Sequence, residues 1–383
     1  MKKTICLVTD WYPSKENPFR GLFFKEQAFS VSDYFDFVVV RTNFHPRKKI
    51  IYKKSNVNRI IENNTIEYTF DLAVPFSVYL ADLVFDNVVR FMNKHTVDGV
   101  GKYISKIHIK YFKNNIVKFF KKHINEDIDV FYCVDAQEEA FNIQCLAEAY
   151  NKPYIVSEHA PFPWPGKVIR DIDKYAIEKA DKYLAISNDK IRQLMLQNVR
   201  LPEICYIGNL IDERKLLFSP VVHDTKTFII VAAHSFYKNY DLFISVINRL
   251  TDITECPFKV MIVGYGSNKG YSKNIDEFED QIRKSKFAEQ AIMIPSVPHE
   301  EIGDVLNRAD AFIMTSIQEG QPVSAMEAAC CGLPIFSTRC GGVEDYVDEN
   351  MGRIYSICDS ESMAQDLKRF LEGDLAFDCK ELF

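Results

Sequence analysis

The chain has 383 residues, of which 47% are hydrophobic and 26% charged, and a formal net charge of −6. This length fits two domains at about 100–200 residues each, and the composition excludes a disordered or fibrous protein. Overall acidity argues against a dedicated nucleic-acid binder, which usually carries a basic domain. The charge is uneven: residues 1–200 hold 30 Lys or Arg and 24 Asp or Glu (+6), whereas residues 201–383 hold 17 and 29 (−12).

The ten cysteines form no CxxC pair or regular framework. Reduced core thiols are therefore favoured over disulfides or metal ligands. The first apolar run, 5–8, is too short for a signal peptide, and no stretch approaches the ~20 apolar residues of a spanning helix. We therefore expect a cytoplasmic protein that is at most peripheral on the inner face of the membrane.

Short β-branched runs alternate with amphipathic segments of helical length, which is typical of a parallel sheet covered by helices. The strands expected in the first half are 4–9, 34–40, 129–134, 153–158 and 182–187, and the helices include 22–32, 78–94 and 138–150. The pattern then restarts, with strands at 227–233, 258–264, 291–295, 311–316 and 333–338 and a helix at 240–250. Two such series predict an α/β protein with two Rossmann-like doubly wound domains facing a cleft, 1–212 and 213–383.

The most informative segment surrounds two glutamates, Glu319 and Glu327, that are eight residues apart. Glu319 follows an expected strand and so lies at the carboxyl edge of the second sheet, where open α/β sheets bind ligands. Gly320 and Pro322 indicate a tight turn, and the helix expected from Val323 would present free N–H groups to an anion. Two carboxylates so placed can hold hydroxyl groups on either side of a phosphate. The alternative is a helix-start charge and a solvated helix face.

This spacing, followed by Gly-Leu-Pro at 332–334 and Gly-Gly at 341–342, resembles the donor-binding segment of the family 4 retaining glycosyltransferases. These enzymes, also called glycosyl transferases group 1, have the GT-B fold. The resemblance implies that Glu319 contacts the transferred sugar and takes part in catalysis, and that Glu327 holds the nucleotide ribose. It also implies that the donor diphosphate is bound by the helix-end residues Gly320, Gln321, Pro322 and Val323.

A second segment that resembles this family follows the strand expected at 227–233. The family has an Arg and a Lys there, both on the diphosphate. Lys238 matches the Lys, but the Arg position falls on Ala232 or Ala233. His234 would replace the Arg in part, although a neutral imidazole is a weak substitute for a guanidinium. Without the resemblance, a solvated surface charge would be the ordinary interpretation of Lys238.

Two segments of the first half resemble the family as well. Gly21 lies in a loop between the first expected strand and helix, where a family glycine approaches the donor diphosphate. His159, at the end of the strand expected at 153–158, matches a histidine beside the reacting sugar. We interpret it as a catalytic residue that positions and polarises the sugar rather than as a general base. A structural histidine is the alternative.

Three further candidates have weaker signals. Asn209 begins an Asn-x-x-Asp sequence that resembles a turn of the family. A residue that only forms the turn is as good an interpretation as one that binds the ligand. Gly264 begins a Gly-x-Gly that is weak as a dinucleotide fingerprint because the third glycine is not in place. Ser296 lies in the segment 295–310, which resembles the loop and helix that flank the nucleotide base.

The stretch 99–125 contains seven lysines and no acidic residue, and aromatic and aliphatic residues recur in it at helical spacing. One interpretation is a core-packed helix with a solvated basic face. The other is attraction to an anionic membrane surface.

The resemblance implies a retaining glycosyltransferase of the hexosyltransferase class that needs no metal or cofactor. Its substrate would be a UDP- or GDP-linked sugar bound by the C-terminal domain, and its acceptor a saccharide or lipid-linked saccharide bound by the N-terminal domain. Cell-surface polysaccharide synthesis is the expected role, with no nucleic-acid partner. Two alternatives stay open: a non-transferring GT-B enzyme such as a sugar-nucleotide epimerase, or a catalytically weak scaffold that binds sugar nucleotides, which the missing Arg suggests.

Overall fold

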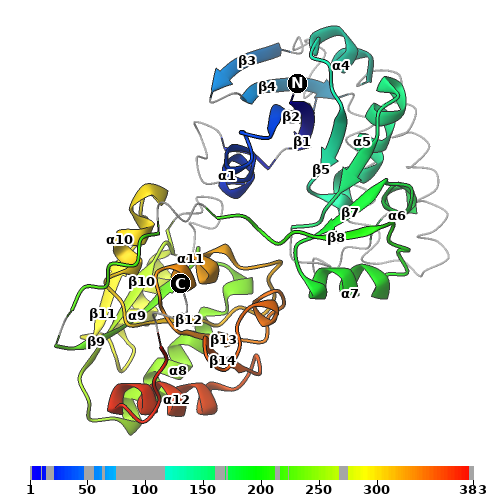
Figure 1. The fold of residues 1–383 in the computed structure, drawn as a ribbon. Coiled ribbons are helices and arrows are strands. Elements are labelled where there is room, and N and C mark those ends of the chain that lie inside the picture. The colour runs from blue at the N-terminus through cyan, green and yellow to red at the C-terminus, as the bar shows by residue number, and fades with distance from the viewer. Residues whose placement is uncertain are drawn as a thin grey trace. The chain divides into compact units, whose positions relative to one another are not determined.

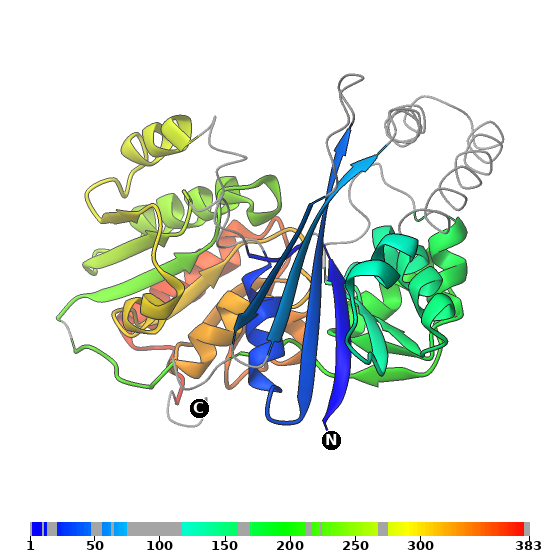
Figure 2. The same ribbon diagram turned by 90° about the horizontal axis from the view of Figure 1, so that it is seen from above.

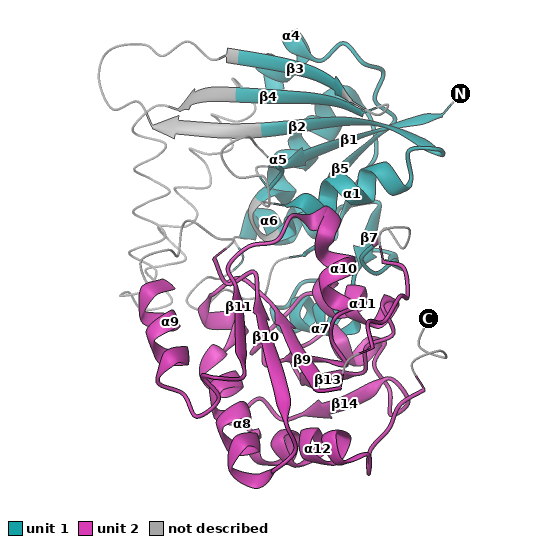
Figure 3. Ribbon diagram, turned by 90° about the vertical axis from the view of Figure 1, so that its left-hand side faces the viewer, with its two compact units in different colours: residues 1–210 teal, residues 211–383 magenta. Residues whose placement is uncertain are grey.

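The computed structural model divides the chain into two compact units, Met1–Leu210 and Ile211–Phe383 (Figure 3). It describes residues 2–9, 11–13, 21–46, 56–62, 65–74, 117–159, 169, 171–211, 216–222, 224–266 and 275–378. The helix expected at 78–94 and residues 99–116 of the basic stretch lie outside the described residues. Among the described residues, no helix has the length and apolar character needed to cross a membrane.

Unit 1 is built on an eight-stranded sheet in the order β3-β4-β2-β1-β5-β6-β7-β8 (Figures 1 and 2). The strands are β1 (Lys3–Thr9), β2 (Phe35–Pro46), β3 (Asn56–Glu62), β4 (Thr65–Val74), β5 (Val130–Cys133), β6 (Tyr154–Val156), β7 (Lys182–Ala185) and β8 (Ile204–Tyr206). The described helices are α1 (Leu22–Ser30), α4 (Val117–His123), α5 (Ala136–Tyr150), α6 (Asp171–Glu178) and α7 (Asn188–Leu196). Neighbouring strands are parallel except for the antiparallel hairpin β3–β4.

Alternation along β1 explains why both faces of this sheet are covered. Cys6 and Val8 lie in one buried cluster with residues of α5, whereas Leu7 lies in another with Phe24 and Ala28 of α1. Successive strand residues point to opposite faces, so a strand that is apolar on both sides needs a helix on each.

Unit 2 has a six-stranded, all-parallel sheet in the order β11-β10-β9-β12-β13-β14. The strands are β9 (Lys226–Val231), β10 (Phe258–Val263), β11 (Ala291–Ile294), β12 (Ala311–Met314), β13 (Ile335–Thr338) and β14 (Gly352–Tyr355). The described helices are α8 (Tyr240–Ile253), α9 (Ile275–Arg283), α10 (Ile302–Leu306), α11 (Val323–Cys330) and α12 (Ser360–Glu372), with short 3-10 turns η3 (Phe236–Lys238), η5 (His299–Glu301) and η6 (Val343–Asp345). One buried cluster joins the sheet to α8 and α12, and another joins it to α10 and α11.

The predicted fold class is confirmed, because each unit is a parallel-dominated α/β sheet with helices on both faces. The strands β3, β4, β8 and β14 have no counterpart among the strands predicted from the sequence. β3 carries polar and exposed residues at a sheet edge, and β8 is a three-residue edge strand with exposed Ile204 and Tyr206. A buried parallel strand is predicted from a continuous run of apolar residues in the sequence, and edge strands lack such a run.

In each sheet the chain builds outward from a first strand and then continues on the other side of that strand, and such a reversal point locates a ligand site in open α/β sheets. In unit 2 the chain runs from β9 outward to β10 and β11, then returns to place β12 on the other side of β9. In unit 1 the corresponding pair is β1 and β5.

Candidate functional site

Two of the predicted residues meet at the reversal point of unit 2. Lys238 ends η3, which follows β9, and Glu319 follows β12. Lys238 Nζ lies 2.6 Å from Glu319 Oε1, and the two side chains are 25% and 12% exposed. The contact therefore joins a cation and a carboxylate, each still open to a ligand, at the carboxyl ends of adjacent strands.

Backbone contacts hold the two segments in place. The Thr315 hydroxyl donates to the Lys238 carbonyl at 3.0 Å, and the Ile317 N–H donates to the Tyr237 carbonyl at 2.7 Å. These bonds extend the pairing of β9 and β12 beyond the ends of the strands. The positions of Lys238 and Glu319 are therefore set by the sheet rather than by flexible loops.

The turn after Glu319 packs against the Gly-Gly turn after β13. The Glu319 N–H donates to the Cys340 carbonyl at 2.7 Å. Gly342 has a φ of +72°, and a Cβ there would overlap the Gly320 carbonyl oxygen and lie 2.7 Å from Gln321 Cα. Gly342 is thus required both for its left-handed backbone and for the close approach of two backbone turns.

Helix α11 begins at Val323, as the sequence predicted, with Pro322 as its N-cap and no side-chain capping bond. The first N–H groups of a helix have no partner within the helix, and its N-terminus carries a partial positive charge. The buried turn Gly320–Pro322 leads into this end. The geometry therefore provides backbone donors for an anion beside Lys238 and Glu319.

Glu327 lies one turn further along α11 and is buried. Its Oε1 accepts from Nε2 of His299, on η5, at 2.9 Å. His299 was within a segment that the sequence analysis assigned to the nucleotide base, but was not itself a candidate. No sequence signal connects residues that are 28 positions apart, since their contact depends on how α10 packs against α11.

The remaining candidates of unit 2 lie around the same sheet edge. Gly264 follows β10 with a φ of +82° and donates its N–H to the Ile294 carbonyl at 2.9 Å. Ser296 is exposed after β11. Neither residue contacts Lys238 or Glu319 through a described hydrogen bond.

His234 is packed among aromatic rings. Its ring centroid lies 4.8 Å from that of Phe278 and 5.5 Å from that of Tyr240. Burial lowers the pKa of His234, although Asp241 acts in the opposite direction. A histidine with a lowered pKa is neutral at pH 7 and adds no fixed positive charge where the family has an Arg.

Two carboxylates, those of Glu319 and Glu344, act on the groups around the Gly-Gly turn. Burial raises the pKa of the Cys340 thiol, and Glu319 and Glu344 raise it further, against Lys238, which lowers it. Burial likewise raises the pKa of Tyr346, with further contributions from Cys340, Glu319 and Glu344. A diphosphate bound here would thus need the helix N-terminus as well as Lys238 to offset its charge.

In unit 1, Gly21 brings two backbone segments close together at the reversal point. Its φ is +62°, and a Cβ would overlap the Trp11 carbonyl oxygen, with the carbonyl carbon at 2.7 Å. Gly21 is also the N-cap of α1 and makes no side-chain capping bond. The predicted approach of a glycine loop to a helix start is therefore present at the end of β1.

His159 packs against the first turn of this same helix. Its ring centroid lies 4.8 Å from that of Phe24 and 5.6 Å from that of Phe23, contacts that the sequence analysis did not foresee. Both ring nitrogens are buried without a hydrogen bond of ordinary geometry. Burial lowers the pKa of His159 to about 3, while the nearby Asn209 raises it and Lys190 lowers it. The imidazole is therefore neutral at physiological pH.

The structure thus brings the candidates together in two groups. Unit 2 joins Lys238, Glu319 and the start of α11, with Glu327 held by His299, and unit 1 joins the Gly21 helix, His159 and Asn209. Among the described residues, no group of three or more His, Cys, Asp or Glu could hold a metal ion.

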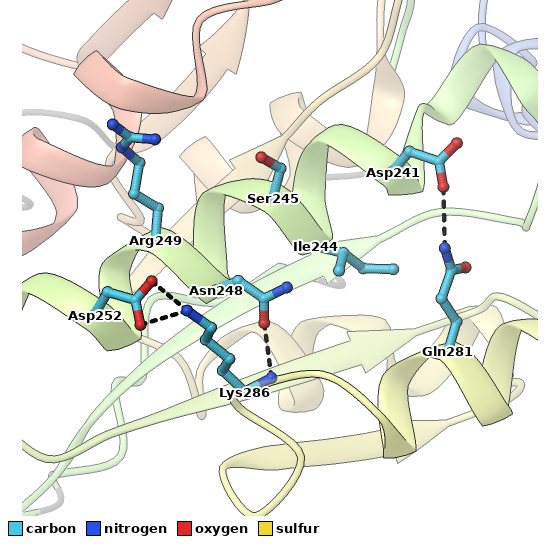
Figure 4. A pocket seen from close by; sticks show the side chains of 8 residues that line it. All are labelled: Asp241, Ile244, Ser245, Asn248, Arg249, Asp252, Gln281 and Lys286. Atoms are coloured by element: carbon cyan, nitrogen blue, oxygen red, sulfur yellow. Dashed lines mark hydrogen bonds and ion pairs between the residues drawn. The ribbon is translucent and has the colours of Figure 1, made fainter.

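A separate hollow lies between α8 and the segment that contains α9 (Figure 4). Its charged groups already have partners. Lys286 Nζ contacts the Asp252 carboxylate at 2.5 and 2.7 Å, Gln281 Nε2 donates to Asp241 at 3.2 Å, and Arg249 pairs with Glu361 of α12. None of the predicted site residues lines it. We therefore place the candidate site at the sheet edge and not in this hollow.

Residues 212–381 match the family model for glycosyl transferases group 1. This part of the chain is therefore similar to the glycosyl transferases of group 1. The match covers unit 2, which carries the paired glutamates, and it confirms the resemblance inferred from the sequence motifs.

Curated relatives of the chain include enzymes that act on lipids and on polysaccharides. It is 30% identical over 130 residues to the phosphatidylinositol N-acetylglucosaminyltransferase gpi3 subunit of Schizosaccharomyces pombe, covering 34% of this chain and 27% of that protein. It is 21% identical over 255 residues to the lipopolysaccharide 1,6-galactosyltransferase of Salmonella typhimurium, covering 65% and 67%. The chain spans only 27% to 39% of the length of the first three such relatives.

Solved structures share the fold over nearly the whole chain. The lipopolysaccharide outer core galactosyltransferase WaaB has a TM-score of 0.64 at 15% identity, covering 99% of this chain and 93% of that one. A sucrose-phosphate synthase from Thermosynechococcus elongatus has a TM-score of 0.70 at 13% identity, covering 97% and 90%. Together with the two parallel sheets, these likenesses confirm the GT-B fold.

The contact at Gly342 predicts the effect of adding one methyl group. Gly342→Ala should lower the free energy of unfolding of unit 2 by about 2–4 kcal/mol, from overpacking and left-handed strain together. Gly373→Ala is the matched control, because Gly373 has a φ of +87° but nothing lies within 4 Å of its Cβ position. It should cost only about 1 kcal/mol. Urea denaturation followed by circular dichroism measures both, and equal losses would contradict the backbone contact.

The buried neutral His159 predicts a specific sensitivity to acid. Between its folded pKa of about 3 and the ordinary histidine pKa of 6.5, the unfolded state binds a proton that the folded state does not, so stability falls as the pH falls. The loss is up to about 1.4 kcal/mol per pH unit, or about 2 kcal/mol between pH 7.5 and 5. His159→Gln should remove this part of the pH dependence. Urea midpoints of both proteins at the two pH values test it, and identical pH dependence would contradict a buried neutral imidazole.

Proposed function

We propose that the chain is a retaining glycosyltransferase that moves a sugar from a UDP- or GDP-linked donor to a saccharide or lipid-linked saccharide acceptor. In this proposal unit 2 binds the donor and unit 1 binds the acceptor, within cell-surface polysaccharide synthesis. The match of residues 212–381 to the family model supports the reaction class, and relatives named for lipopolysaccharide and amylovoran biosynthesis support the role. Structures with this fold that hold UDP or UDP-glucose support the donor class.

The contact between Lys238 and Glu319 carries the proposal. It lies at the strand-order reversal, beside a helix N-terminus with no side-chain cap. Lys238 and the first N–H groups of α11 would bind the diphosphate, while the Glu319 carboxylate would accept hydrogen bonds from sugar hydroxyl groups. A cation, a carboxylate and oriented backbone donors at one sheet edge match the parts of a nucleotide sugar.

The proposed chemistry needs no protein nucleophile. The bond from the anomeric carbon to the phosphate oxygen breaks as the bond to the acceptor oxygen forms on the same face, and the leaving phosphate takes the acceptor proton. Lys238 and the α11 N-terminus would stabilise the charge that grows on that phosphate. Neutral His159 would orient a sugar hydroxyl rather than transfer a proton. We propose that the reaction is metal-independent, with these groups offsetting the phosphate charge.

We further propose that the basic stretch meets an anionic membrane surface. Within its described part, α4 exposes Lys118, Lys121 and Lys122 while Val117 and Phe120 are buried. This arrangement supports an amphipathic helix whose basic face is open to solvent, where each Lys near anionic lipid adds about 1 kcal/mol.

Replacing the three exposed lysines tests the membrane proposal. The triple substitution to Gln should reduce sedimentation with vesicles of phosphatidylglycerol and phosphatidylcholine by at least tenfold at 0.1 M salt, since about 3 kcal/mol of attraction is removed. Transfer to a soluble saccharide should be unchanged. Vesicle binding that does not respond to the substitutions, or to salt, would contradict the proposal.

Replacing Glu319 separates transfer from nucleotide binding. Glu319→Gln should lower the rate of transfer by a factor of about 10²–10³, because a transition-state contact to the sugar is lost. The affinity for UDP or GDP should stay equal or rise, since a negative charge beside the diphosphate is removed and Lys238 is released. Lys238→Gln should instead weaken nucleotide binding by about tenfold, because a charge-assisted contact is lost.

Calorimetry against a panel of UDP- and GDP-sugars identifies the donor, and chromatography measures transfer. Glu349→Gln, an exposed carboxylate of the same unit, is the matched control. Normal transfer by Glu319→Gln would overturn the site. Donor binding without transfer to any acceptor would favour the sugar-nucleotide-binding scaffold that the missing Arg suggests, and failure of every donor to bind would overturn the proposal. Release of nucleotide without any acceptor would favour a non-transferring enzyme.

A further inference from the structure

The ribose-binding part of the candidate site contains a histidine that the proposed function does not use. His299 Nε2 donates to Glu327 Oε1 at 2.9 Å, and the two side chains are 23% and 7% exposed. Glu327 is therefore held inside the unit by one hydrogen bond, with its second carboxylate oxygen left to interact with a ligand.

The core of unit 2 sets this contact. His299 opens η5, which continues directly into α10, and Glu327 lies on α11. Ile302, Val305 and Leu306 of α10 share a buried cluster with Ala325 and Ala328 of α11. Figure 3 shows the two helices side by side at one end of the sheet. The histidine and the glutamate are thus brought together by helix packing before any ligand arrives.

A glutamate has three rotatable side-chain bonds, and fixing them when a ligand binds costs affinity. A partner that holds the carboxylate beforehand removes that cost and fixes the direction in which the free oxygen points. Vicinal hydroxyl groups, as on a ribose, need a hydrogen-bond acceptor in a defined direction. A group that holds the glutamate carboxylate in place therefore strengthens the binding of the ribose.

We propose that His299 is a positioning residue that orients Glu327 toward the ribose hydroxyl groups of the donor nucleotide. This inference rests on the proposed function, in which Glu327 accepts from that ribose. His299 touches no reacting atom, so it acts on donor affinity and on KM and leaves the transfer step alone.

Nucleotides that lack the ribose hydroxyl groups provide the test. Calorimetry compares UDP (or GDP, where it binds more tightly) with its 2′,3′-dideoxy analogue on wild type, His299→Ala and His299→Gln. His299→Ala should weaken the ribonucleotide by about 5- to 15-fold, the loss of one hydrogen bond to a charged group, and the dideoxy analogue by less than twofold. His299→Gln, whose amide can also donate, should restore at least half of the lost affinity. In transfer assays KM should rise while kcat stays within twofold.

Glu349→Ala is the matched control, because Glu349 is an exposed carboxylate of the same unit that lies outside the segment 295–310, and the substitution should change neither affinity. Equal weakening of both nucleotides by His299→Ala would show a general structural role and overturn the inference, as would unchanged ribonucleotide affinity. Failure of the proposed function is distinguishable, since the wild-type chain would then bind neither nucleotide.

Discussion

The ion pair between Lys238 and Glu319 is the interaction on which the proposed donor site depends. It joins the segments after β9 and β12, at the single place in unit 2 where the strand order reverses. Because the family Arg position holds Ala232 or Ala233 and His234 is neutral, Lys238 is the cation that contacts the Glu319 carboxylate at this edge. The pair therefore balances an otherwise acidic site, and a bound diphosphate would take Lys238 from the carboxylate while sugar hydroxyl groups take its place.

In both units a glycine allows two backbone turns to lie in close contact. Gly21 in unit 1 and Gly342 in unit 2 both have positive φ, and each lies where one backbone turn passes against another. A side chain at either position would separate the turns and move the adjacent helix start. Ligand sites at sheet reversals need this close approach, because the groups that bind are backbone N–H groups and cannot extend outward as side chains do.

The sequence predicted the sheet order of neither unit but did predict the parts that meet at the sheet edges. Buried strands such as β9, β10 and β12 appear as continuous apolar runs, and the turn and helix start after Glu319 follow from local residue preferences. The contact of His299 with Glu327, and that of His159 with the rings of α1, join distant segments and depend on tertiary packing. Local patterns carry no information on such pairs. Glu327 and His159 were therefore predicted from the sequence, whereas their partners were not.

The uneven charge of the chain follows the division into two units, of which unit 1 is basic and unit 2 is acidic. Unit 1 carries 30 Lys or Arg and 25 Asp or Glu, and unit 2 carries 17 and 28. An acidic unit can still hold a diphosphate, because screened surface charges act weakly beyond about 10 Å whereas helix N–H groups and Lys238 act at contact distance. Burial raises the pKa of Cys340, and the Glu319 and Glu344 carboxylates raise it further, so negative charge lies close to this turn as well. The net negative charge of unit 2 disfavours an anionic donor. Selectivity for such a donor must therefore come from a few oriented groups at the reversal point, namely Lys238 and the N–H groups at the start of α11.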